Sequence, residues 1–351
     1  MARPITMEQV ARELGLSRRV VSSVVNNKAR ERGVRPETEE RVRAYLKESG
    51  FVPSAYARGL RMGAQETVGI LYGGHLYSHL TDGFNRIVDH FNQTQNGVSV
   101  KLAPRDAVEQ GLQDLISQGV RYLVWLHAGP FACETNSLQS LLPYLLQFEK
   151  RIVYNYRFED GSLDAFLRQK QIYMVGVDRS EGFRKLGNLL NNLGHKRVII
   201  PHPERAALSM GALRAFKAAG IDCICCNEYG ATSVEKTNFK KLAAEIKKVI
   251  RNQGITAACF VDDEIAGNAM TALLSQGIRI PEDLTVTGFD GLPLAGSFAV
   301  PLTTLSVPVE KMAGRVKRII RGELKRFRQC CNLELIERES HGSPRMDRSG
   351  S

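Results

Sequence analysis

The side chains best suited to chemistry in this sequence lie in residues 17–26, which read SRRVVSSVVN. Arg18 and Arg19 each carry a guanidinium that can bond both acceptor atoms on the major-groove edge of guanine, and serine hydroxyls can bond several bases. The valines recur at helical spacing, so a helix that starts at Arg18 is expected to turn the arginines, Ser22 and Ser23 away from its apolar side. These residues predict a surface that reads DNA. The alternative is the solvated face of an ordinary small helical domain.

Two further helices are expected to hold this segment in place. Residues 7–14 have the pattern of a first helix, which Thr6 can cap, and a turn with glycine follows it. Two short helices joined by such a turn, in a basic chain, are typical of a helix-turn-helix. A third helix is expected from Pro36 to about Ser49, because proline favours a first helical position and Gly50 can end the helix.

The positive charge of the chain is concentrated around these elements. The whole sequence has 48 Lys and Arg against 37 Asp and Glu, a formal net charge of +11. Residues 1–62 contain 13 basic and 7 acidic side chains, so less than a fifth of the chain carries a net charge of +6. Asn26 and Asn27 follow the second helix with side chains suited to phosphate oxygens, and binding is expected to weaken steeply as salt rises. A second basic run, residues 315–328, is interpreted as a solvated helix face, with DNA contact as the less favoured alternative.

Several separated motifs extend this pattern along the chain. Residues 6–63 combine the helix-turn-helix with Thr38, Gly50-Phe51, Pro53 and an Ala57-Arg58-x-Leu60-Arg61 segment. Further motifs are VGVD (175–178), LGHKR (193–197), IPEDLTVTGFD (280–290) and PLTTL (301–305). Together they resemble the LacI/GalR family of bacterial transcription regulators over about residues 5–340. The resemblance implies that the second helix enters the major groove, while a hinge helix enters the minor groove and wedges Leu60 into a base step.

The residue types and the family resemblance together predict the residues that contact DNA. They are Thr6, Ser17, Arg18, Arg19, Ser22, Ser23, Asn26, Asn27, Tyr56, Arg58 and Leu60. The chain departs from the family pattern at Val20 and Ser23, where threonine and arginine are common. Arg18 and Arg19 are therefore expected to carry more of the base recognition. Gly59 weakens the hinge helix by about 0.5–1 kcal/mol, which predicts a hinge that orders only on DNA.

From Thr67 onward, apolar strands alternate with amphipathic helices, which predicts an α/β core of two doubly wound parallel sheets. The strands are expected near 68–72, 98–103, 122–126 and 152–156 in one set, and near 174–177, 198–200, 221–225, 257–261 and 285–289 in the other. The resemblance implies a bilobed core like a periplasmic binding protein. The expected domains are a helix-turn-helix head (1–52), a hinge helix (53–64), a first lobe (about 65–157 and 291–324), a second lobe (about 158–290 and 325–339) and a disordered tail (340–351).

A ligand site is expected between the lobes, because ligands of such sheets bind at the carboxyl ends of strands. By resemblance, Asp263 matches an aspartate that bonds sugar hydroxyls or other polar ligand groups in relatives. The other expected effector residues stand at strand ends or just after them: His75, Tyr77, His127, Tyr156 and Asp290. Each of these could equally be a packing or turn residue. A sugar or related metabolite is the expected effector, and a regulator without an effector remains open.

Motifs of catalysis are missing from the sequence. It contains neither a G-x-x-x-x-G-K-[ST] phosphate loop nor a G-x-S-x-G nucleophile elbow. Asp262, Asp263 and Glu264 could suggest a metal site, but acidic residues are also favoured at the start of a helix. The cysteines of residues 223–226 lack a second pair at zinc spacing and are expected to be small buried residues. No catalytic residue, metal or cofactor is therefore predicted.

The sequence also indicates the compartment and the assembly. The chain has no apolar run of about 18 residues, its first residues lack a signal segment, and its seven cysteines are an odd number. These features predict a cytoplasmic bacterial protein, at the nucleoid, without a membrane partner. One head contacts few bases, so a homodimer on a pseudo-palindromic operator in double-stranded DNA is expected. The predicted function is a repressor controlled by a small molecule; the alternatives are a bilobed sugar-binding protein or an enzyme.

Overall fold

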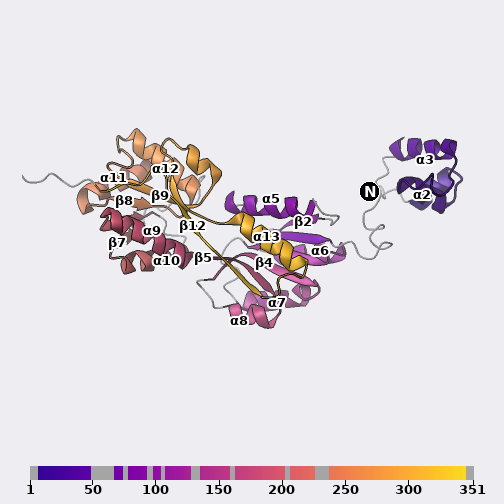
Figure 1. Cartoon of the computed structure of the whole chain (residues 1–351), viewed down its shortest axis with the longest axis horizontal. Helices are drawn as coiled ribbons and strands as arrows, with labels where there is room; N and C mark the ends of the chain where they lie inside the picture. Colours follow the sequence, from indigo (N-terminus) through magenta and orange to yellow (C-terminus); the bar gives the residue numbers. More distant parts are fainter. Residues whose placement is uncertain are drawn as a thin grey trace, which may run out of the picture. The chain divides into compact units, whose positions relative to one another are not determined.

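The computed structural model describes residues 7–48, 67–73, 78–92, 98–103, 107–127, 135–158, 163–201, 206–225 and 237–344. The chain divides into two compact units, residues 1–65 and 66–351 (Figure 1). Among the helices of these ranges, none combines the length and the apolar character needed to cross a membrane.

The first unit is a bundle of three short helices. They are α1 (Met7–Glu13), α2 (Arg18–Val25) and α3 (Pro36–Glu48), at the positions that the sequence predicts. Val10, Val21, Val24 and Val42 are buried together at its centre, with at most 1% of each residue exposed. One layer of valines thus joins all three helices. The helical spacing of these valines is what made the helices recognisable in the sequence.

The second unit begins with a six-stranded parallel sheet in the order β11-β5-β4-β3-β1-β2. The strands are β1 (Val68–Gly73), β2 (Val98–Ala103), β3 (Tyr122–His127), β4 (Lys150–Arg157), β5 (Tyr173–Asp178) and β11 (Arg328–Asn332). Helices α5 (Ser78–Asn92) and α13 (Val309–Ile320) cover one face, and α6 (Val108–Ser117), α7 (Thr135–Leu145) and α8 (Asp164–Gln169) cover the other (Figure 1). Apolar residues on both faces are what an entirely parallel sheet requires.

A second six-stranded sheet has the order β12-β10-β9-β8-β6-β7. Its strands are β6 (Arg197–Ile200), β7 (Asp222–Cys225), β8 (Ala257–Cys259), β9 (Thr285–Asp290), β10 (Thr303–Ser306) and β12 (Glu334–Ile336), of which β12 runs antiparallel to β10. Helices α9 (Arg179–Leu193) and α10 (Ala206–Ala218) pack on one face; α11 (Phe239–Gln253), α12 (Asp263–Ser275) and the 3₁₀ helix η3 (Pro293–Ser297) pack on the other. The prediction of two doubly wound sheets is confirmed.

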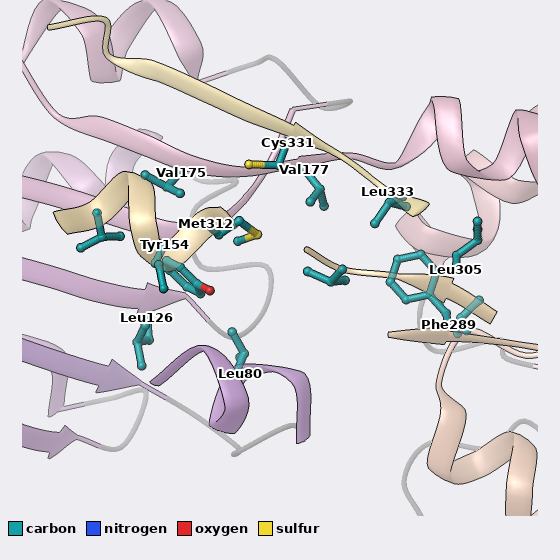
Figure 2. Packing of buried hydrophobic residues seen from close by; sticks show 14 of the residues in the cluster. Leu80, Leu126, Tyr154, Val175, Val177, Phe289, Leu305, Met312, Cys331 and Leu333 are labelled. Atoms are coloured by element: carbon teal, nitrogen blue, oxygen red, sulfur yellow. The ribbon is translucent and has the colours of Figure 1, made fainter. Parts of the chain in front are cut away.

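One apolar cluster continues from the first sheet to the second. Figure 2 shows Val177 and Cys331 of the first sheet, Leu333 of the connection, and Phe289 of the second sheet in this cluster. The approach is close: a Cβ on Gly182 of α9 would lie 2.6 Å from a methyl group of Leu333. The two lobes therefore meet through tightly packed connecting segments.

The expected boundary between the lobes is wrong in three places. The strand near residues 174–177 was assigned to the second lobe, but β5 pairs with β4 in the first sheet. Residues 303–306 were assigned to the first lobe, but β10 pairs with β9, and β11 returns to the first sheet beside β5. The chain thus crosses between the sheets after β5, after β10 and after β11. Hydrophobic periodicity identifies a strand but carries no information on its neighbours, which explains the error.

The expected disordered tail is also wrong for residues 340–344. Ser340 is fully buried; its hydroxyl donates to Val286 O (2.6 Å) and accepts a bond from Thr303 N (2.9 Å). Gly342 N donates to Thr285 Oγ1 (3.0 Å). Polar bonds rather than apolar contacts hold this segment, so its composition gave no signal of order. Residues 345–351 lie outside the described part of the chain.

Candidate nucleic-acid interface and ligand site

Helix α2 presents its charged side because its valines are buried. Ser17 caps the helix, with its hydroxyl 3.4 Å from Val20 N. Ser17, Arg18 and Arg19 are exposed. Within residues 7–48, no ion pair joins either arginine to a carboxylate. Both guanidinium groups therefore keep their donors available for an external acceptor, as base or phosphate recognition requires.

Ser22 and Ser23 do not project from this surface, which corrects the expectation from the sequence. They are 8% and 2% exposed, respectively. Ser23 Oγ donates to Arg19 O (2.8 Å), and Asn26 Nδ2 donates to Ser22 O (2.7 Å) and to Ser22 Oγ (3.2 Å). A short hydroxyl in a helix can turn back to a carbonyl four residues earlier, and a helical wheel does not reveal this. Of the side chains of this helix that were expected to contact bases, Arg18 and Arg19 are thus the exposed ones.

The end of α2 is braced by α3. Asn27 is exposed and has a φ of 55°, which closes the helix. Arg43 Nη2 donates to Asn27 Oδ1 (3.1 Å) and also pairs with Glu39 (2.7 Å). This contact holds the C-terminal end of α2 against α3. The predicted DNA contacts Thr6, Tyr56, Arg58 and Leu60 lie outside the described residues.

Asp263, the first residue of α12, is completely buried. Its Oδ1 accepts a hydrogen bond from Thr304 Oγ1 (2.6 Å) and its Oδ2 accepts one from Leu292 N (2.8 Å). Burial, together with the negative charge of Asp290, raises the pKa of Asp263 to about 7. The carboxyl lies so close to β9 that a Cβ on Gly288 would be 2.2 Å from its Oδ1. Both oxygens are thus engaged inside the second lobe rather than open to a ligand.

Asp290 ends β9 at the carboxyl edge of the second sheet. It is 6% exposed and has a φ of 111°, and its backbone oxygen accepts a hydrogen bond from Val307 N (3.0 Å). A positive φ at a non-glycine residue costs free energy that the surroundings must supply. The residue therefore sits in a constrained turn, directly beside the crossing from β10 to the first lobe.

Tyr156 was expected in the wall of the ligand site, and the structure places it elsewhere. The register of β4 shifts between Tyr154 and Tyr156, where Asn155 has a φ of 66°. Such a bulge sends the following side chain to the opposite face of the sheet. Tyr156 therefore packs edge-on against Phe158, with ring centroids 5.0 Å apart, in the core under α6, α7 and α8. Its ring is a packing element.

Of the three remaining predicted effector residues, the structure describes one, His127. His127 ends β3, at the carboxyl edge of the first sheet. His75 and Tyr77 lie outside the described residues.

Comparison with known proteins shows which regulators and which fold the chain resembles. Residues 180–341 match the periplasmic binding protein-like domain family. The chain is 26% identical over 332 residues to the HTH-type transcriptional regulator CelR of Thermobifida fusca, covering 90% of each protein. It is 27% identical over 330 residues to the HTH-type transcriptional repressor PurR of Vibrio vulnificus, covering 91% of this chain and 92% of that protein. The Lac repressor dimer bound to operator and the anti-inducer ONPF superposes with a TM-score of 0.71 at 19% identity, over 97% of this chain and 100% of that one.

In sequence and in fold the chain is similar to transcription regulators of the LacI/GalR family over about nine-tenths of its length. The sequence predicted this resemblance, and it is confirmed. These relatives are named as regulators of transcription and not as enzymes.

The chain also has a buried charged residue, Arg179, for which the sequence predicted no role. Arg179 begins α9 directly after β5 and is 7% exposed. Its guanidinium carbon lies 5.5 Å from the ring centroid of Phe289, a distance at which a cation is attracted to an aromatic face. Arg179 directly follows β5 of the first sheet and Phe289 lies near the end of β9 in the second, so this contact joins the carboxyl edges of both sheets. Its position after a strand that ends in VGVD was the available signal.

The acidic cluster at α12 forms hydrogen bonds within the protein. Asp262 caps the helix, and its Oδ1 accepts bonds from Glu264 N (2.9 Å) and Ile265 N (3.0 Å). In the described ranges, no group of three or more His, Cys, Asp and Glu side chains is arranged to hold a metal ion. The interpretation as acidic residues at a helix start accounts for these contacts.

Proposed function

We propose that this LacI/GalR chain is a sequence-specific repressor that binds a pseudo-palindromic operator in double-stranded DNA as a homodimer, and that a small polar molecule controls this binding. The observation that carries the proposal is the pair of exposed guanidinium groups at Arg18 and Arg19, on a helix whose opposite side is buried. The Lac repressor neighbour, described as a dimer bound to operator, supports the same assembly here.

The proposed ligand is a hydroxyl-rich molecule such as a sugar. A LacI-family structure of CcpA from Weissella paramesenteroides, with bound glucose, superposes on 79% of this chain with a TM-score of 0.63. Arg179 would donate to the ligand and Asp290 would accept from it, since both lie at the carboxyl edges of the sheets. His75, Tyr77 and His127 stay proposed wall residues. Asp263 would act indirectly, by holding the turn at Leu292.

The proposed mechanism is a shift between two arrangements of the lobes. The chain crosses between the sheets three times, and Arg179 and Phe289 touch across them. A ligand that binds one arrangement better would favour it, and the hinge at residues 53–64 would respond by ordering or losing its helix. The protein would act in the cytoplasm, at the nucleoid, and without catalytic turnover.

Selection from random duplexes by the full-length protein tests the proposal. We expect one enriched sequence with two related half-sites, whose binding weakens steeply with salt. Candidate sugars are then tested for binding by thermal shift and for altered operator affinity. Equal affinity for all duplexes at low salt, with and without these sugars, would refute the proposed function. Chemical turnover of a bound sugar would favour an enzyme instead.

A further inference from the structure

Basic side chains from separate connections lie along one edge of the first sheet, where its strands begin. The strands are parallel, so β1, β3, β4, β5 and β11 all start at this edge. Backbone hydrogen bonds follow it: Arg121 N donates to Thr67 O (3.1 Å), and Glu149 N donates to Arg121 O (2.9 Å). At its other end, Met174 N donates to Phe327 O (2.7 Å). The edge is therefore one continuous row from the start of β1 to the start of β11.

Helix α13 ends at the same edge, because it leads from the end of β10 to the start of β11. The turn after it contains Arg321, Lys325 and Arg326, and Phe327 then packs against Tyr173, with ring centroids 4.8 Å apart. Lys150 lies 5.7 Å from the ring of that tyrosine. The α13 turn is thus joined to the connections before β4 and β5 by direct contacts.

The cations of this row outnumber its carboxylates. We define the basic edge as Arg121, Lys150, Arg151, Arg321, Lys325 and Arg326. Its acidic neighbours are already paired, Glu149 with Arg121 and Glu323 with Arg318 (3.3 Å).

The six cations differ in how they are engaged. Arg151 donates to backbone carbonyls, including Phe148 O (3.2 Å). Arg321, Lys325 and Arg326 are exposed, and no ion pair joins them to a carboxylate in the described ranges. Three cations of the row are therefore available to a partner.

The turn that displays these three cations is fixed by internal bonds. Gly322 adopts a φ of 75°, and Glu323 N donates to Arg318 O (2.9 Å). Gln329 is buried, and its Nε2 donates to Arg326 O (2.7 Å). A solvated charge run needs no such anchoring, whereas groups held in place lose less entropy when they bind.

We propose that the basic edge is a second DNA-contacting surface, which binds backbone phosphates next to the operator. The inference rests on the proposed function. Strand β1 starts at this edge, so the chain that leads back to the DNA-reading head begins here. Arginine and lysine side chains suit phosphate oxygens, and contacts to phosphates position a protein on DNA without reading its sequence. The basic edge thus adds affinity outside the bases that α2 reads.

The test compares two variants of the full-length protein with equal changes in net charge. One is R321Q/K325Q/R326Q in the α13 turn. The matched control is K240Q/K248Q/R251Q, three exposed cations on α11 of the second lobe, where no ion pair engages them among the described residues. Both are measured against a duplex that ends at the selected operator and against one with flanks of about one helical turn on each side. Thermal unfolding of both variants confirms that the fold is intact.

We expect the wild type and the control to bind the flanked duplex more tightly than the short one. The α13-turn variant should lose this advantage. Its plot of log K against log salt should also become less steep, by about 1 in slope for each lost phosphate contact. An unchanged slope on the flanked duplex, or an equal loss of affinity in the control, would overturn the inference. Unchanged DNA binding would overturn it as well and would indicate that these cations bind another partner, such as an acidic protein. Failure of the wild type to prefer any duplex would instead count against the proposed function.

Discussion

Thr304 Oγ1 donates a hydrogen bond of 2.6 Å to Asp263 Oδ1, which ties β10 to the start of α12. The carboxyl also holds the turn at Leu292. Both bonds favour the ionised form, but burial and the charge of Asp290 outweigh them and raise the pKa of Asp263 to about 7. A carboxyl that changes charge near neutral pH therefore lies beside the crossing between the lobes.

The first prediction concerns the pH dependence that Asp263 imposes. Its folded pKa is above the unfolded value of 3.8, so the folded state retains a proton that the unfolded state releases. The free energy of unfolding should therefore fall as pH rises from about 4 to about 7, as far as this group determines it. Asp263→Asn removes this titration and leaves an amide N–H facing Leu292 N or Thr304 Oγ1, so the variant should be less stable by about 1–3 kcal/mol at acid pH.

Urea unfolding of both proteins across this pH range checks the prediction. The stability difference between wild type and Asp263→Asn should shrink as pH rises toward 7. Thr304→Val is the companion variant: it removes the donor to Oδ1 and keeps the carboxyl, so the pH dependence should persist and move to higher pH. A difference that stays constant between acid and neutral pH would show that Asp263 is not the titrating group.

The second prediction separates the exposed from the buried polar residues of α2. Arg19→Ala should weaken binding to the selected operator by about 1–3 kcal/mol and relax the preference at one or two positions of each half-site. Ser23→Ala removes a hydroxyl that bonds Arg19 O within the helix, so it should change operator specificity little. Binding to the operator and to random duplexes, measured for both variants, decides between base and phosphate contact. Equal losses on both duplexes for Arg19→Ala would assign this arginine to phosphate alone.

The residues that sequence analysis placed correctly and those it misplaced differ in physical character. Val10, Val21 and Val24 were predictable, because burial of apolar residues imposes a period that can be counted. The burial of Ser22 and Ser23 was not predictable, because their hydroxyls form hydrogen bonds within the helix and its end, and hydrophobic periodicity does not reveal such bonds.

Tyr156 illustrates how a local feature defeats an alternating pattern. Regular alternation would put Tyr154 and Tyr156 on one face, but the bulge at Asn155 separates them into two cores. Similarly, the VGVD strand and the strand near 152–156 were both visible in the sequence, while their pairing as β5 and β4 was not. Of the proposed ligand site, the strand-end positions were predictable, whereas the burial of Asp263 and the contact of Arg179 with Phe289 required the structure.

The third prediction concerns His195, which is 1% exposed. Its Nδ1 is 2.8 Å from Thr256 Oγ1, and its Nε2 is 2.8 Å from Gly342 O. Burial lowers the pKa of His195 below its ordinary value of 6.5. The unfolded state therefore takes up a proton first as pH falls, so stability that is present at neutral pH should be lost below about 6.5.

Replacement by a group that does not titrate tests this account. His195→Asn should be less stable than wild type at pH 7.5, because the bonds to Thr256 and Gly342 cannot both be kept, and the cost should be about 1–3 kcal/mol. The difference should narrow as pH falls below about 6.5. Thr256→Val keeps the imidazole and should retain the acid sensitivity. An acid sensitivity in His195→Asn as large as that of wild type would contradict the assignment.

The fourth prediction uses two glycines to test the bulge in β4. A Cβ on Gly176 would lie 1.8 Å from Tyr156 O, a backbone atom that can move only if the sheet pairing changes. Gly176→Ala should therefore destabilise the second unit by about 3 kcal/mol or more. Gly314 lies inside α13, and a Cβ there would meet no other atom within 4 Å, so Gly314→Ala should be neutral or stabilising by up to about 1 kcal/mol. Urea unfolding of the two variants measures the contrast, and similar stabilities would mean that β4 and β5 do not approach as closely as the bulge requires.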